Sequence, residues 1–282
     1  MKDYSRNFLF YPPLALASGT WGLGENLFKY YSPAEVKETF GVLVTKGISL
    51  KPRIGNLPPR IWETPCGLIN SIGLANPGVK EFKKIFLTGL LKTEVKIFVN
   101  LYGEEIEDFV ALAEEFKGTG VSGLELNISC PNVKKGGIAF ASQPEVVKEL
   151  VKEVRKVWEG SLWVKLSPVG PVLDVAKACE SSGADAIVCA NTYPGLVVIE
   201  GEKVLKGGVS GPAIKPLTLR LVYELSREVS IPIVGCGGIA SAKDVLDYFV
   251  CGAKAVEIGT AFLIDPELAK KIAKELKEKW DM

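Results

Sequence analysis

A cysteine stands among small polar residues in the stretch "ELNISCPNVKKGG", residues 125–137. The stretch begins like a buried strand, and Ser129, Cys130 and Pro131 mark the point where that strand turns into a loop. The chain contains no histidine, so proton transfer near neutral pH falls to a thiol, a lysine, a tyrosine or a carboxyl group with a shifted pKa. Cys130 is therefore a candidate general base, and by position alone a buried thiol at a turn fits it equally well.

Polar side chains also follow most of the other apolar runs that we predict as strands. An amide or ammonium group inside a barrel is costly unless a ligand or a neighbour satisfies it. Any one of these residues alone is best explained as a capping residue, but six of eight strand ends together favour a site for an anionic, planar ligand rich in hydrogen-bonding groups. The six residues are Ser18, Lys46, Asn100, Asn127, Lys165 and Asn191.

Glycines follow the last two predicted strands, in "GCGGIAS" (235–241) and "EIGTAF" (257–262). Barrels commonly bind phosphate there, through exposed backbone N–H groups and a helix N-terminus. We expect Gly237, Gly238, Gly259 and Thr260 to form such a site. The alternative is that these glycines only tighten turns.

These residues need elements to position them, and eight short apolar runs alternate with amphipathic stretches such as 103–116, 142–158 and 241–252. This alternation is typical of parallel strands covered by helices. It predicts a single domain over 1–282, an α/β fold of the (β/α)8 TIM barrel type, with an open doubly wound sheet as the second choice. The runs begin at Leu14, Val42, Ile97, Leu124, Leu162, Ala186, Ile231 and Ala255.

Two connections, 48–78 and 193–211, are longer than a strand-to-helix loop requires. Long ordered loops in a compact domain are usually functional, and in a barrel those on the C-terminal face surround the active site. We expect both to be insertions over that face, acting as lids or binding loops. Surface hairpins are the alternative, and the second connection has the pattern of one.

The composition excludes several classes of function. The 282 residues carry 34 basic and 33 acidic side chains, so no overall charge favours a nucleic acid or an anionic membrane. The six cysteines form no C-x-x-C pair, so neither a metal site nor a cluster is expected in this chain. No apolar run is long enough to span a membrane. We interpret the chain as a cytoplasmic protein.

Several of these motifs together resemble dihydroorotate dehydrogenase. They are "NISCPNVKKGG", "GGVSGPAIKP", "GCGGI", "ANT", "EIGTA" and "LASGTWG", and the likeness runs over nearly the whole chain. The stretch "TKGISLKPRIGNLPPRIWETPCGLINSIGLANPG" is similar to the class 1B catalytic subunit in particular. Class 2 enzymes, with a membrane segment and a serine base, fit poorly.

The resemblance implies a barrel that binds FMN and oxidises dihydroorotate to orotate in pyrimidine (UMP) biosynthesis. Carried over by position, Cys130 takes the C5 proton while hydride leaves C6 for the flavin. Lys165 lies near the N1–C2 edge of the flavin, and Lys46 reaches both flavin and substrate. A cation is a suitable partner for the carboxylate of orotate.

The resemblance also assigns binding residues. Those on the pyrimidine side are Lys46, Asn70, Ser71, Ile72, Gly73, Leu74, Asn127, Asn191 and Thr192. Those on the flavin side are Ser18, Lys46, Gly47, Asn100, Asn127, Lys165, Ala190, Gly211, Gly237, Gly238, Gly259 and Thr260. The sequence departs from the family pattern at "NTYPG" (191–195), where Pro194 bears on the mobility of the loop, and in a short C-terminus.

Class 1B resemblance further implies a route for the electrons. The chain has no strand-linked G-x-G-x-x-G fingerprint and no cysteine spacing for a cluster. The resemblance to class 1B implies a separate subunit that carries FAD and a [2Fe–2S] cluster and passes electrons to NAD. This subunit is expected to bind a catalytic homodimer in a heterotetramer. Within enzymes, the alternatives are a class 1A fumarate-dependent dihydroorotate dehydrogenase and a related dihydropyrimidine dehydrogenase. A non-catalytic flavin-binding barrel is the alternative from another class.

Overall fold

Eight parallel strands close into a barrel in the computed structural model, which describes residues 8–129, 142–199, 201 and 203–280. Their order around the barrel is β1, β12, β11, β8, β7, β6, β5 and β2. Each contains part of one of the eight apolar runs predicted as strands, so the (β/α)8 prediction is confirmed. The bounds are β1 Leu14–Leu16, β2 Val42–Val44, β5 Lys96–Leu101, β6 Gly123–Asn127, β7 Ser161–Lys165, β8 Ala186–Cys189, β11 Ile233–Cys236 and β12 Ala255–Ile258.

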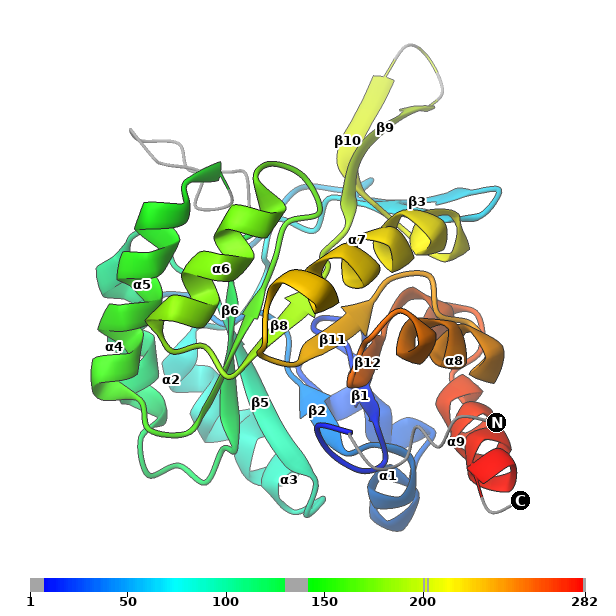
Figure 1. The fold of residues 1–282 in the computed structure, drawn as a ribbon, viewed down its shortest axis with the longest axis horizontal. Helices are drawn as coiled ribbons and strands as arrows, with labels where there is room; N and C mark the ends of the chain where they lie inside the picture. Colours follow the sequence, from blue (N-terminus) through cyan, green and yellow to red (C-terminus); the bar gives the residue numbers. More distant parts are fainter. Residues whose placement is uncertain (1–7, 130–141, 200, 202, 281–282) are drawn as a thin grey trace.

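Amphipathic helices surround the barrel (Figure 1). The α-helices are α1 Pro33–Thr39, α2 Val79–Phe82, α3 Thr88–Leu91, α4 Ile106–Phe116, α5 Pro144–Val157, α6 Val172–Ser182, α7 Lys215–Glu228, α8 Ala242–Val250 and α9 Leu268–Trp280. Shorter turns are the 3₁₀ segments η2 Glu25–Lys29, η5 Pro212–Ile214 and η6 Thr260–Leu263, and the π segment η3 Lys83–Leu87. No helix among the described residues is both long and apolar enough to cross a membrane.

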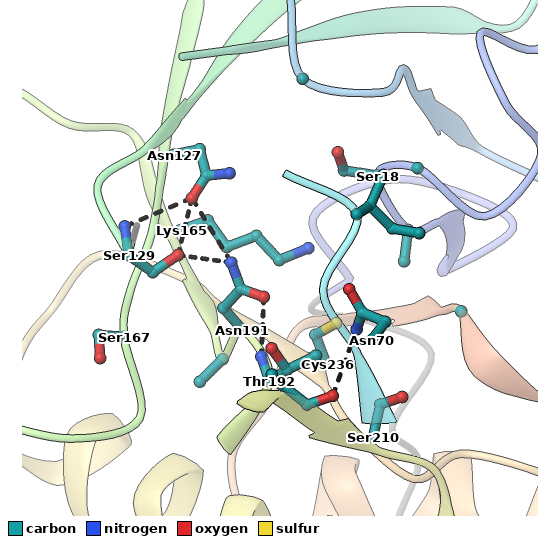
Figure 2. A pocket seen from close by; sticks show the side chains of 18 of the residues that line it. Ser18, Asn70, Asn127, Ser129, Lys165, Ser167, Asn191, Thr192, Ser210 and Cys236 are labelled. Atoms are coloured by element: carbon teal, nitrogen blue, oxygen red, sulfur yellow. Dashed lines mark hydrogen bonds between the residues drawn. The ribbon is translucent and has the colours of Figure 1, made fainter. Parts of the chain in front are cut away.

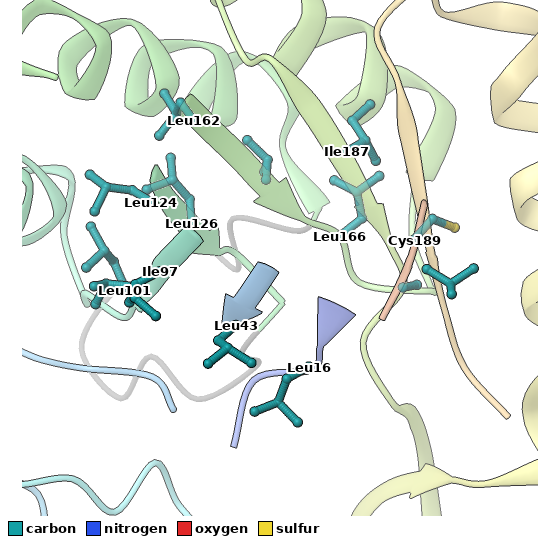
Figure 3. Packing of buried hydrophobic residues seen from close by; sticks show 14 of the residues in the cluster. Leu16, Leu43, Ile97, Leu101, Leu124, Leu126, Leu162, Leu166, Ile187 and Cys189 are labelled. Carbon is teal, nitrogen blue, oxygen red and sulfur yellow. The ribbon is translucent and has the colours of Figure 1, made fainter. Parts of the chain in front are cut away.

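The helices form because their apolar residues recur at helical spacing. In α5 the buried side chains are Val147, Leu150, Val151 and Val154, which lie on one face, and Pro144 occupies the first turn, where no N–H bond is lost. This face packs against side chains that point outward from the strands, such as Leu124 and Leu162 (Figure 3). The main core therefore lies between the strands and the helices.

Strand alternation decides what enters the barrel, because successive side chains point to opposite faces. On β7, Leu162 and Val164 belong to the outer core, whereas Trp163 packs inside with Phe98, their ring centroids 4.1 Å apart. Phe10 stacks on Trp163 from the other side, at 5.8 Å. These aromatic rings fill the N-terminal end of the barrel, and the cavity described below opens at the other end.

The two long connections meet in a second, antiparallel sheet. Its order is β3 (Ile61–Thr64), β4 (Gly67–Asn70), β10 (Lys203–Ser210) and β9 (Tyr193–Ile199). Each connection is thus a hairpin, and β4 pairs with β10 to join them. The β9–β10 hairpin projects away from the barrel (Figure 1). Pro194 is tolerated in β9 because this strand is at the edge of the sheet, where a missing N–H breaks no ladder.

Candidate functional site

A cavity of about 1780 Å³ opens at the C-terminal end of the barrel strands. It is lined by residues from the barrel and from the second sheet. Every predicted site residue that the structure describes lines it: Ser18, Lys46, Gly47, Asn70, Ser71, Ile72, Gly73, Leu74, Asn100, Asn127, Lys165, Ala190, Asn191, Thr192, Gly211, Gly237, Gly238, Gly259 and Thr260. Cys130 lies outside the described residues, so its role stays a prediction from the sequence.

The next inward-pointing positions beyond the aromatic plug are polar and charged. Lys165 on β7 donates to Glu257 Oε2 on β12 at 2.5 Å, and its Nζ lies 3.9 Å from Glu125 Oε1 on β6. Asn100 on β5 donates to the same Glu125 oxygen at 2.5 Å. All four side chains are buried. Asn100, Lys165 and Glu257 line the floor of the cavity, and Glu125 contacts Asn100 and Lys165. We call these four residues the carboxyl–lysine cluster.

The net effect of burial and neighbouring charges raises the pKa values of both Glu125 and Lys165, for different reasons. For Glu125, burial first and the Glu257 charge second raise the pKa well above its ordinary value. For Lys165, burial lowers the pKa, but the surrounding acidic groups outweigh it and the net shift is upward. Lys165 is therefore held as an ammonium ion at the base of the cavity.

A hydrogen-bonded network lies on one side of the cavity, at the ends of β6 and β8 (Figure 2). Ser129 Oγ donates to Asn127 Oδ1 at 2.7 Å, and Asn191 Nδ2 donates to Ser129 Oγ at 2.5 Å. The Asn191 amide oxygen in turn accepts from the Thr192 backbone N–H at 2.7 Å. These bonds fix the orientation of both asparagine amides before any ligand is bound. Ser129 is the residue directly before Cys130.

Lys46 provides a second cation at the cavity. It is half-buried, and no ion pair joins it to another residue among those the structure describes. Burial, and then the charge of Arg60, lower the pKa of Lys46. Glu25 offsets this lowering only in part, and a half-buried ammonium with no direct ion pair in the described part of the chain is suited to bind an anion from solution.

The glycine loops are shaped by the protein around them. Tyr248 donates to the carbonyl oxygen of Gly237 at 2.6 Å. Gly238 has a φ of 67°, and a Cβ there would lie 2.7 Å from Lys215 Cβ and 2.9 Å from the Gly211 carbonyl oxygen. Only glycine fits this position, because both the conformation and the space exclude a side chain.

The N-terminus of α8, expected to help bind phosphate, is capped by the protein itself. Asp244 accepts from the Ala240 N–H at 2.9 Å and from the Ser241 hydroxyl at 2.8 Å, and it pairs with Lys215. Binding of an anion at this end would therefore depend on the two glycine loops more than on the first turn of α8.

The sequence reasoning missed three residues at the base of the cavity: Glu257 and Cys236, which line it, and Glu125, which contacts Asn100 and Lys165. Glu125 and Glu257 interrupt the apolar strands β6 and β12. Glu125 lies two residues before Asn127 on β6, so both side chains point into the barrel. Glu257 also points inward, where it meets Lys165 of β7. A charged residue at an inward position of a barrel strand was the available signal. Cys236 ends β11 and lines the cavity.

The fold and the site define an α/β barrel whose C-terminal mouth is a cavity lined by two lysines and by oriented asparagine amides. A family model described as dihydroorotate dehydrogenase matches residues 5–280, and the chain belongs to this family. It is 44% identical over 272 residues to the "Dihydroorotate dehydrogenase B (NAD(+)), catalytic subunit" of Thermoanaerobacter pseudethanolicus, covering 94% of this chain and 89% of that protein. The proteins of the same name from Anoxybacillus flavithermus and Geobacter sp. are 45% and 42% identical, each over 94% of this chain and over 86% and 88% of their own lengths.

Proposed function

We propose that this chain is the FMN-binding catalytic subunit of an NAD-linked dihydroorotate dehydrogenase, which oxidises dihydroorotate to orotate. The observation that carries the proposal is the convergence of two cations and a fixed asparagine network on one cavity. Lys46 and Lys165 supply positive charge, and Asn127 and Asn191 supply oriented amides. The names of the relatives at 42% to 45% identity support the same activity.

The cavity residues fit a flavin mononucleotide. Asn100 Oδ1 is buried and accepts no hydrogen bond within the described part of the chain, so a ligand N–H would satisfy it. Gly47 is adjacent, and a Cβ there would come within 2.9 Å of the same oxygen. The loops at Gly237–Gly238 and Gly259–Thr260 would hold the phosphate, with Lys165 toward the ring. When bound, FMN supplies hydride acceptance from the substrate.

The protein's own residues then bind the substrate and move its proton. Lys46 faces the carboxylate of dihydroorotate, and amides of Asn127, Asn191 and Asn70 bind the polar edge of the pyrimidine. Cys130, directly after Ser129 in the chain, takes the C5 proton as a general base. With FMN bound, the ammonium group of Lys165 would stabilise negative charge on the flavin ring, because it is already in place at the base of the cavity.

Electrons leave through a partner subunit, for which we propose FAD and a [2Fe–2S] cluster, in a heterotetramer around a catalytic homodimer. An exposed apolar surface on the second sheet supports a contact near the cavity. Leu196 lines the cavity and is 50% exposed, and Val198 and Val204, paired across β9 and β10, are 65% and 52% exposed. Such a patch commonly marks a protein interface. We call these three residues the hairpin surface.

Anaerobic reduction by substrate tests the activity directly. The purified chain should carry FMN, and dihydroorotate should bleach the flavin absorbance in a single turnover without any partner. Dithionite provides the control, because it reduces any bound flavin whatever the substrate specificity. Bleaching by dithionite but not by dihydroorotate would leave a flavin-binding barrel without this activity.

A further inference from the structure

Two carboxyl groups in the carboxyl–lysine cluster each leave one oxygen without a hydrogen bond. Glu125 and Glu257 are 0% and 1% exposed, and within the described residues Glu125 Oε2 and Glu257 Oε1 have no donor. An unsatisfied carboxylate oxygen at this depth is costly. The two side chains lie within hydrogen-bonding reach of each other, so one proton held between them would let the protonated carboxyl group donate and the ionised one accept.

Charge counting gives the same answer. Two ionised carboxylates and one ammonium leave a net negative charge in a buried site, whereas one protonated carboxyl group makes the cluster neutral. Glu257 is the ionised partner, because Lys165 donates to it at 2.5 Å, while Lys165 Nζ is 3.9 Å from Glu125. The raised pKa of Glu125, caused by burial and by the Glu257 charge, agrees with this assignment.

Other groups around the pair do not alter the count. Cys236 faces it from β11, and burial raises the pKa of this thiol to about 12, so it adds no charge at neutral pH. Asn100 faces it from β5 and is uncharged. The inward side chains of the remaining strands are apolar, as at Ala15, Val44 and Val188.

We propose that Glu125 and Glu257 share one proton and act together as positioning residues that keep Lys165 charged at the floor of the cavity. In this proposal both carboxyl groups act through Lys165, which Glu257 contacts at 2.5 Å and Glu125 at 3.9 Å. The role of Lys165 toward a flavin rests on the proposed function, whereas the shared proton does not.

Infrared spectroscopy of the protein without flavin tests the shared proton. At neutral pH, wild type should show one protonated-carboxyl band that shifts in D₂O, and Glu125→Gln should lose it. Glu257→Gln should also lose it, because Glu125 then becomes the only counter-ion for Lys165 and ionises. The matched control is Glu228→Gln, on an exposed ion pair with Lys177, which should keep the band.

Two outcomes would overturn the shared proton. Absence of the band in wild type would mean that both carboxyl groups are ionised. Persistence of the band in Glu257→Gln would mean that burial alone protonates Glu125, with no sharing.

The reduction potential of the bound flavin tests the positioning role. Either single glutamine variant should leave the potential close to wild type, because one carboxylate suffices to keep Lys165 charged. The double variant Glu125→Gln/Glu257→Gln should lower it, because a buried lysine without a counter-ion gives up its proton and the flavin loses its cation. An unchanged or raised potential in the double variant would refute the positioning role. Wild-type protein that binds no flavin at all would instead count against the proposed function.

Discussion

The amide of Asn191 donates to the hydroxyl of Ser129 at 2.5 Å, joining the ends of two barrel strands 62 residues apart in the sequence. Because Ser129 also donates to Asn127, one serine orients both amides. The arrangement is complete in the protein alone, so binding a pyrimidine requires no reordering of these side chains.

Asn191→Ala should weaken orotate binding about tenfold, because it removes one direct hydrogen bond and the partner of Ser129. The change in flavin absorbance on titration with orotate measures the affinity. Asn26→Ala is the matched control, since Asn26 does not line the cavity. Equal affinities in both variants would exclude Asn191 from the substrate site.

Cys130→Ala should keep its flavin but reduce it about 100- to 10,000-fold more slowly with dihydroorotate, the usual contribution of a positioned general base. Stopped-flow absorbance gives the rate. Cys130→Ser should recover part of the loss only at high pH, because a hydroxyl is a much weaker acid than a thiol. A wild-type rate in Cys130→Ala would assign the proton to another group, with Tyr193 the next candidate.

Gly238→Ala should yield protein with little or no flavin, because the new Cβ meets Lys215 and the Gly211 carbonyl oxygen and displaces the loop. The flavin-to-protein absorbance ratio measures this. Gly118→Ala is the control: its φ of 68° is close to the 67° of Gly238, and a Cβ there has no atom within 4 Å. Full flavin content in Gly238→Ala would place the phosphate elsewhere.

Lys46→Ala should weaken orotate binding about 10- to 100-fold, the usual range for a lost hydrogen bond to a charged group, with a smaller effect on flavin content. Lys165→Met should mainly slow flavin reduction. Because burial and then Arg60 lower the pKa of Lys46, orotate affinity should fall as pH rises through that lowered value. In Lys46→Arg the fall should shift to higher pH. Identical losses in Lys46→Ala and Lys165→Met would contradict separate roles for the two lysines.

The isolated chain should bleach with dihydroorotate yet reduce NAD only slowly, and adding the partner subunit should restore NAD reduction. Val198→Lys/Val204→Glu should block this restoration, since it makes the hairpin surface polar while the paired charges preserve the hairpin and the net charge. The control is Val250→Lys, which changes a similarly exposed valine of α8. With this variant, adding the partner subunit should restore NAD reduction as in wild type. Rapid NAD reduction by the pure chain, or a preference for fumarate, would refute the partner-linked reading.

The sequence by itself determined the barrel and most of its site, for a physical reason. Each strand of a parallel barrel is a short apolar run with a polar residue at its end, so Lys46, Asn127 and Asn191 could be assigned to one mouth without any contact being known. The glycine pairs after the last strands were readable in the same local way.

The tertiary structure alone decided what depends on residues far apart in the sequence. The pairing of β4 with β10 turns two separate connections into one sheet beside the cavity. The contact of Lys165 with Glu257, 92 residues away, follows from barrel closure, which brings β7 and β12 to face each other across the interior. No local pattern encodes that distance, because strand alternation states which side chains point inward but not which of them meet.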